Sequence, residues 1–225
     1  MEDRVILKND LGSQNEYAFY AVCDGHGGSQ TADYLVSHLG HKINTWLTMI
    51  QLHPVQESDV IKGMNDIFNS ISETICDQTE KGQKIYSGST CVAILIHQPT
   101  GISYLINLGD SRAIHIRNGH VIQKTKDHKP ENRQEKERIQ KAGGIVIQTR
   151  IMGNHGNLGI SRTIGDVDFL KKGVISDPDI YSLLTLQNQD IIVLASDGVW
   201  NVIHNDEMPQ LVTKYLQKMP ILLKN

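Results

Sequence analysis

The chain has 225 residues, of which 39% are hydrophobic and 21% are charged, and its formal net charge is −3 at pH 7. These values are ordinary for a single globular domain. The slight acidity and the lack of a Lys/Arg-rich run argue against nucleic acid as a partner. No apolar run reaches the roughly 18 residues that a membrane span needs, so we expect no membrane segment.

The three cysteines, Cys23, Cys76 and Cys91, are widely spaced and form no C-x-x-C pair. An odd number without motif spacing is typical of reduced thiols, so we expect free cysteines in an intracellular protein. We find no secretory signal before the first predicted strand and no N-x-S/T sequon. Both observations favour the cytoplasm or the nucleus.

The first predicted elements are one strand and two long helices. Residues 17–23 (YAFYAVC) are rich in β-formers and end at Asp24-Gly25. Apolar residues then recur at helical spacing over residues 29–50 and again over residues 58–79. The weakly structured stretch 53–58 is expected to link the two helices.

Four strands are predicted next, with no helix between them, at residues 90–97, 101–108, 113–116 and 121–125. Asn118-Gly119 separates the last two, and this dipeptide is the strongest short signal for a hairpin. Strands that follow one another through tight turns favour antiparallel sheets over a doubly wound parallel sheet.

The last part of the chain mixes helices with one strand. A helix is predicted over residues 131–141, between Pro130 and Gly143. Residues 190–195 (DIIVLA) form a near-continuous apolar run, which we expect to be a strand buried on both faces. A final helix is predicted over 206–219, with Asn205 as its N-cap. Two packed sheets with helices outside would satisfy all these apolar faces.

Acidic residues stand next to small residues where three predicted strands end. Asp24 follows YAVC, Asp110 follows YLINL and a glycine, and Asp197 follows IIVLA and a serine. A single Asp-Gly is more often a turn, but three such sites at the ends of buried strands favour a shared cluster. Carboxylates gathered together repel one another unless they bind cations or protons. Ligands that are all oxygen suit Mg²⁺ or Mn²⁺.

His26 lies among glycines two residues after Asp24, so packing in the core is not its role. A histidine beside a metal site can act as a general acid. We interpret the other nine histidines as surface or structural residues, with His155 in the glycine-rich loop 153–159 as a minor candidate for touching substrate. That loop is not G-x-G-x-x-G, and no P-loop motif is present, so nucleotide binding has little support.

The motifs of the chain resemble those of the metal-dependent protein phosphatases usually called PP2C. In the family's order they are MED at 1–3, DGHGG at 24–28, SGST at 87–90, NLGDSR at 107–112, NLGISRTIGD at 157–166, DP at 177–178 and ASDGVW at 195–200. Each motif is weak alone, but seven in one order are highly specific.

The resemblance implies an α+β fold in which two antiparallel β-sheets form a central sandwich flanked by pairs of antiparallel α-helices. It implies a protein serine/threonine phosphatase whose partners are phosphoprotein substrates, and we expect a monomer. The catalytic domain would occupy residues 1–225, with a flap subregion at about 143–172.

The resemblance also implies a metal site. Glu2, Asp24 and the carbonyl of Gly25 would hold one Mg²⁺ or Mn²⁺ ion. Asp24 would bridge to a second ion, which Asp197 also holds. Asp110 would help Asp197 to place a third, weaker ion.

Three further residues receive roles from the resemblance. His26 would give a proton to the leaving seryl or threonyl oxygen. Asp3 would orient His26 or metal-bound waters. Arg162 would lie in the flap beside the active site and bind substrate. The cysteines have no part in this chemistry, because no covalent enzyme intermediate is needed.

The chain departs from the family's pattern at both ends. The family's phosphate-binding arginine would precede Met1, and Arg4 does not match it. The closing G-x-x-D-N motif, whose aspartate completes the metal site, is not found. We therefore expect a partial domain, without the first and final strands, that binds metal weakly and has little activity alone.

Two other functions stay open. A PP2C-like binding module would keep the fold but not the catalysis, an alternative that the missing aspartate favours and the retained acidic residues disfavour. A metal-dependent phosphohydrolase that acts on nucleotides is disfavoured, because no P-loop and no basic or aromatic base-binding pattern is present.

Overall fold

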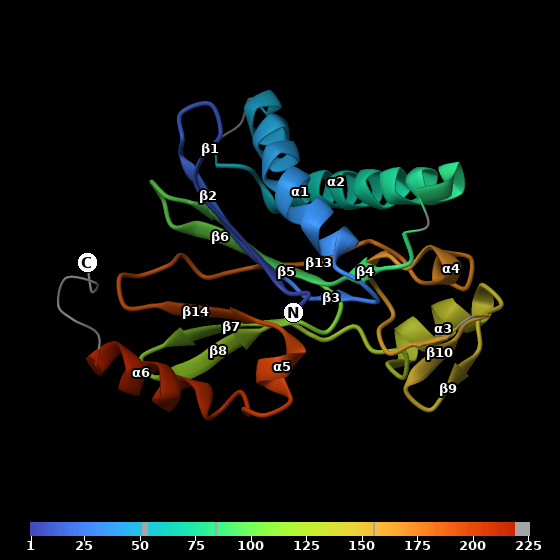
Figure 1. The fold of residues 1–225 in the computed structure, drawn as a ribbon. Coiled ribbons are helices and arrows are strands. Elements are labelled where there is room, and N and C mark those ends of the chain that lie inside the picture. Colours follow the sequence, from blue (N-terminus) through green and yellow to red (C-terminus); the bar gives the residue numbers. More distant parts are fainter. Residues whose placement is uncertain (51–53, 84, 155, 219–225) are drawn as a thin grey trace.

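The computed structural model describes residues 1–50, 54–83, 85–154 and 156–218 (Figure 1). The helices are α1 (Gln30–Met49), α2 (Glu57–Gln78), α3 (Arg133–Lys141), α4 (Val167–Leu170), α5 (Asp197–Trp200) and α6 (Met208–Lys218), with a π-helical turn η1 (Thr79–Gln83) after α2. The strands are β1 (Arg4–Leu11), β2 (Tyr17–Cys23), β3 (Gly25–His26), β4 (Gly88–Ser89), β5 (Cys91–His97), β6 (Ile102–Leu108), β7 (Arg112–Arg117), β8 (His120–Lys124), β9 (Val146–Ile147), β10 (Arg150–Met152), β11 (Asn157–Leu158), β12 (Ile164–Gly165), β13 (Asp179–Ser182) and β14 (Ile191–Ala195).

Two antiparallel sheets form the centre of the molecule. One has five strands in the order β1-β2-β5-β6-β13, and the other has three in the order β14-β7-β8. Figure 1 shows the two sheets stacked, with α1 and α2 outside the larger one and α5 and α6 outside the smaller one. This arrangement confirms the predicted α+β sandwich with helices on its outer faces.

Strand β5 shows how the sequence builds these layers. Successive side chains of a strand point to opposite faces. Cys91, Ala93 and Leu95 pack with the helical layer of α1 and α2. Val92 and Ile94 pack instead in the cluster between the two sheets, which also contains residues of β6, β7 and β14. Because both faces of β5 are covered, its sequence is apolar from Cys91 to Ile96.

The boundaries of the predicted elements agree with the structure to within one or two residues. Several elements were not predicted, namely β1, β3, β4, β9 to β13, α4 and α5. Two expectations were wrong. Strand β14 is half-buried along most of its length rather than buried on both faces, because it is the edge of the three-stranded sheet. Helix α6 begins at Met208, so Asn205 is not its N-cap; the side-chain oxygen of Asn205 accepts a hydrogen bond from Arg112 instead.

A third sheet, made of two-residue strands, has the order β12-β4-β3. Gly88 of β4 is opposite His26 on one side and opposite Gly165 on the other. This sheet therefore joins three segments that are far apart in the chain. A further sheet, β11-β10-β9, packs with α3 around Ile139 and Ile151.

The three cysteines are free thiols, as predicted, and Cys23 and Cys91 are buried. No helix in the described part of the chain is both long enough and apolar enough to cross a bilayer.

Candidate active site

Asp24 stands at the end of β2, where neighbouring strands hold its backbone. Its N–H donates to the hydroxyl of Thr90 at 3.2 Å, and its carbonyl accepts from the N–H of Thr90 at 2.9 Å. The Ser89 hydroxyl donates to the same carbonyl at 3.3 Å. These contacts fix the backbone of Asp24, so its carboxylate starts from a defined position at the edge of the sandwich.

Other carboxylates surround Asp24. Burial, followed by the charges of Asp3 and Asp197, a hydrogen bond with Asp3 and the charge of Asp110, raises the pKa of Asp24 to about 7. The prediction that acidic residues from the ends of separate strands gather at one place is therefore correct. Carboxylates held this close together repel one another unless a cation or a proton lies between them.

Asp110 follows β6 and has a cationic partner. Gly109, with φ +97°, makes the turn, and a side chain there would meet Thr90 at 2.6 Å. The carboxylate of Asp110 then accepts from Lys129 Nζ at 2.5 Å. Lys129 was not singled out in the sequence, because nothing in its spacing indicates that it reaches Asp110.

Asp197 and Asp3 lie at the other side of the cluster. Asp197 begins α5 directly after β14, and Asn201 donates to its carboxylate at 3.1 Å. The hydroxyl of Ser196 donates to Asp3 at 3.1 Å. Asp3 thus contacts Asp24 and Ser196, which places it among the carboxylates rather than beside His26.

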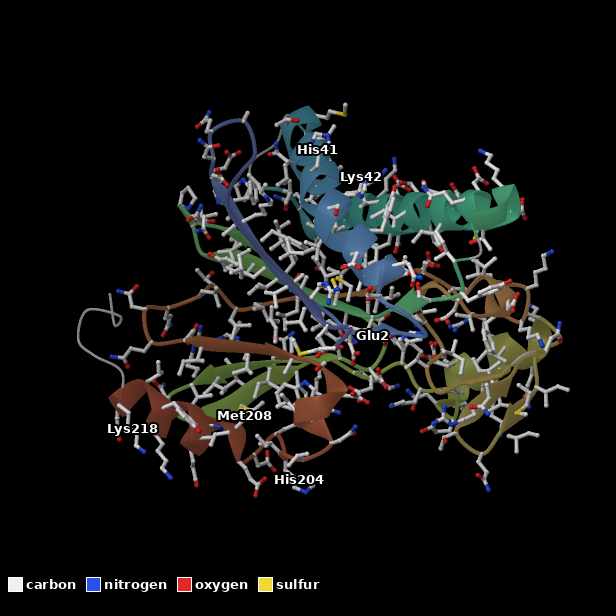
Figure 2. All side chains as sticks on the ribbon, viewed as in Figure 1. Glu2, His41, Lys42, His204, Met208 and Lys218 are labelled. Carbon is white, nitrogen blue, oxygen red and sulfur yellow. The ribbon has the colours of Figure 1, made fainter. Side chains whose placement is uncertain are left out.

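Glu2 lies at the chain's start against the turn that follows Asp24. Its carboxylate accepts from the N–H of Gly28 at 3.1 Å, and a side chain at Gly25 would meet its backbone carbonyl at 2.8 Å. Figure 2 shows Glu2 near the middle of the molecule, close to β3. The structure thus places Glu2 beside Gly25, as the predicted first metal site requires, although its role as a ligand stays a prediction.

His26 has a partner that sequence reasoning missed. Its Nε2 lies 2.6 Å from Oδ2 of Asp166. Burial alone would lower the pKa of His26, but the hydrogen bond and charge of Asp166, with the charges of Asp24 and Asp110, outweigh it and raise that pKa. Asp166 is the last residue of the motif NLGISRTIGD, but no rule of sequence spacing pairs it with His26.

Arg162 lies in a half-buried ion-pair network. Its guanidinium donates to Glu135 at 2.8 Å and to Asp179 at 2.8 Å, and also to the carbonyl of Asp177 at 3.0 Å. Arg162 is not among the residues that line the cleft described below. Its role in binding substrate therefore stays a prediction, which these contacts do not favour.

The acidic cluster opens into a cleft of about 1090 Å³. Its walls include Asp24, Asp110 and Asp197, together with His26 and Asp166. Residues of the β9–β11 region also line the cleft, among them the basic Arg150. His155 lies outside the described residues. Within those residues, no three Asp, Glu, His or Cys side chains are close enough to hold a metal ion as they stand.

A family model described as "Protein phosphatase 2C" matches residues 1–224. The chain belongs to the protein phosphatase 2C family. Protein phosphatase 1B of Rattus norvegicus is 38% identical over 218 residues, which are 90% of this chain and 54% of the relative. Protein phosphatase 1A of Homo sapiens is 36% identical over 212 residues, which are 89% of this chain and 54% of the relative. The chain spans about half the length of these relatives.

Solved structures of the same fold confirm the protein phosphatase 2C architecture. One, described as a C. elegans sex determining protein, has a TM-score of 0.81 at 26% identity and covers 97% of this chain and 53% of that chain. A serine-threonine phosphatase 2C from Toxoplasma gondii has a TM-score of 0.78 at 23% identity, covering 96% of this chain and 79% of that chain.

Proposed function

We propose that this chain hydrolyses phosphoserine and phosphothreonine in proteins, with Mg²⁺ or Mn²⁺ as cofactor and His26 as general acid. The main observation behind the proposal is that one open cleft is lined by three aspartates and a histidine, namely Asp24, Asp110, Asp197 and His26. The family and the names of its relatives support phosphatase chemistry.

The chemistry of the residues present fits hard divalent cations. The candidate ligands, Glu2, Asp24, the Gly25 carbonyl, Asp110 and Asp197, offer only oxygen atoms. Burial and the neighbouring carboxylates raise the pKa of Asp24, and a bound cation would relieve the repulsion among those carboxylates. When bound, Mg²⁺ or Mn²⁺ supplies an activated water and neutralises phosphoryl oxygens.

The chain's own residues supply the rest of the chemistry. Asp24 and Asp197, held at the ends of β2 and β14, set the position of the phosphoryl group. His26, about a third exposed at 34%, faces the same cleft and gives a proton to the leaving oxygen. Because an alkoxide is a poor leaving group, this proton matters most for phosphoserine and phosphothreonine.

The test is phosphate release from a phosphothreonine peptide by the 225-residue chain with Mn²⁺ or Mg²⁺. We expect release that is slow, below ordinary enzyme turnover numbers of about 1 per second and upward, because we expect the chain to be a partial domain that binds metal weakly. EDTA should abolish this release, and Asp24→Asn should reduce it by at least about 100-fold. Asp66→Asn, a change on the exposed face of α2, is the matched control and should leave the rate unchanged.

Two results would contradict the proposal. Metal binding in calorimetry without any phosphate release would favour the PP2C-like binding module. Faster release from a nucleotide than from the phosphopeptide would favour the nucleotide phosphohydrolase.

A further inference from the structure

We propose that Asp166 is a positioning residue for His26. Its carboxylate accepts a hydrogen bond from Nε2–H of His26, so the other ring nitrogen, Nδ1, is the one that donates a proton to the substrate. This inference rests on the proposed function, in which His26 is the general acid. It adds a residue to which neither the family resemblance nor the sequence assigned a role.

The first observation is the contact itself. Nε2 of His26 and Oδ2 of Asp166 are 2.6 Å apart, a short distance typical of a charge-assisted hydrogen bond. The Asp166 side chain is only 7% exposed, whereas that of His26 is 34% exposed. The carboxylate therefore holds the inner end of the ring, and the outer end faces the cleft.

The second observation is the backbone of Asp166. Its φ is +48°, in the left-handed region that residues other than glycine seldom adopt. A residue other than glycine keeps this backbone conformation only where surrounding contacts fix it. Here the Asp166 N–H donates to the carbonyl of Ser87 at 3.2 Å, and its carbonyl accepts from Phe169 at 2.8 Å. The strained turn aims the carboxylate at His26.

The third observation is Gly88, which lies over the pair. It is opposite His26 in β3 and opposite Gly165 in β12, so one residue sets the spacing between both partners. A Cβ at position 88 would lie 2.0 Å from Oδ2 of Asp166 and 2.4 Å from Nε2 of His26. The absence of a side chain at Gly88 thus makes room for the hydrogen bond.

The chemical consequence follows from donors and acceptors. A carboxylate only accepts, so the shared proton belongs to Nε2 of His26. Among the described residues, Nδ1 has no hydrogen-bond partner. As the bond between phosphorus and the leaving oxygen breaks, the Nδ1 proton passes to that oxygen, and a neutral ring with its Nε2–H on Asp166 remains. The carboxylate fixes the tautomer in the manner of a His–Asp pair.

The test compares two substrates on the 225-residue chain. A p-nitrophenolate leaves without a proton, whereas the alkoxide of phosphothreonine needs one. We expect Asp166→Asn to lower kcat on a phosphothreonine peptide by about 30-fold or more, since general acids contribute about 100-fold and upward. The same variant should change kcat on p-nitrophenyl phosphate by less than about threefold. KM for both should stay the same.

Two further variants sharpen the result. Gly88→Ala separates the pair without removing either partner and should show the same dependence on the leaving group. In a His26→Ala background, Asp166→Asn should not lower kcat any further, because the effects of two residues that act as one unit are not additive. Asp66→Asn serves again as the exposed control.

A second measurement does not depend on turnover. In ¹⁵N NMR spectra of the neutral imidazole, wild-type His26 should carry its proton on Nε2, and Asp166→Asn should lose this single tautomer. The proposal would be overturned if Asp166→Asn lowered kcat equally on both substrates. It would also be overturned if the neutral wild-type ring carried its proton on Nδ1. If the wild-type chain hydrolyses neither substrate, the proposed function fails, and the NMR result alone decides the role of Asp166.

Discussion

Lys129 places its Nζ 2.5 Å from Oδ2 of Asp110, so one carboxylate of the acidic cluster already has a cation of the chain's own beside it. An ammonium group competes with a divalent ion when both bind the same carboxylate oxygen. The structure therefore predicts that Lys129 tunes metal binding at this end of the cleft.

Lys129→Met should raise the affinity for Mn²⁺ by about three- to tenfold, as calorimetry would measure. In EDTA, the same change should lower the free energy of unfolding by about 1 kcal/mol at most, because the lysine is a third exposed and its pair is partly screened. Lys126→Met, at an exposed position in the same loop, is the control. A weaker Mn²⁺ affinity in Lys129→Met would show that the lysine does not compete.

Glu135 anchors the network around Arg162, and its loss should destabilise the fold. The carboxylate is buried and accepts hydrogen bonds from Arg138, Arg162 and Ser161. Glu135→Gln leaves two half-buried guanidinium groups without their shared anion, so we expect a loss of about 3 kcal/mol in urea denaturation. Glu137→Gln, in an exposed pair with Arg133, should cost less than about 0.5 kcal/mol. Similar losses in both variants would contradict this assignment.

The same carboxylate predicts a dependence of stability on pH. Burial would raise the pKa of Glu135, but hydrogen bonds from Arg162, Arg138 and Ser161 outweigh it and lower that pKa from 4.5 to about 2. A lowered pKa in the folded state stabilises the protein above the unfolded value, and this stability is lost as the pH falls from about 4.5 to about 2. The difference in unfolding free energy between wild type and Glu135→Gln should therefore be constant above about pH 5 and shrink below it.

Thiol labelling checks the cysteines. A hydrogen bond with Cys23 and burial raise the pKa of Cys91 well above its usual value, and burial raises that of Cys76. Because the thiolate is the reactive form, iodoacetamide at pH 7 should modify Cys76 slowly and leave Cys23 and Cys91 untouched. All three should react in urea. Modification of Cys91 before Cys76 in the native protein, detected by mass spectrometry, would contradict the buried placement.

The layers could be predicted because their strands carry strong apolar patterns. Strand β1 could not, since most of its residues are exposed at the edge of the sheet and only Ile6 and Leu11 are buried. Strand β13 is four residues long and mostly half-buried. Edge strands contribute few buried side chains, so their sequences show little of the alternation that identifies a strand.

The acidic part of the site could be predicted for a similar reason. Asp24, Asp110 and Asp197 each follow an apolar strand, and strands of one sandwich end at common edges. The partners of His26 and Asp110 could not be predicted, because Asp166 and Lys129 reach the site from loops. Arg162 was assigned by motif alone, and its contacts with Glu135 and Asp179 depend on α3 and β13, which no local pattern connects to it.

The small sheet β12-β4-β3 has a consequence for the order in which the protein matures on the ribosome. His26 and Asp24 are synthesised early, Gly88 later, and Asp166 and Asp197 later still. A growing chain can place its first strands and helices, but the histidine meets its carboxylate only after β12 has emerged and paired. The candidate active site is thus among the last parts of the domain to assemble, and an interrupted synthesis product that lacks β12 leaves His26 without its carboxylate partner.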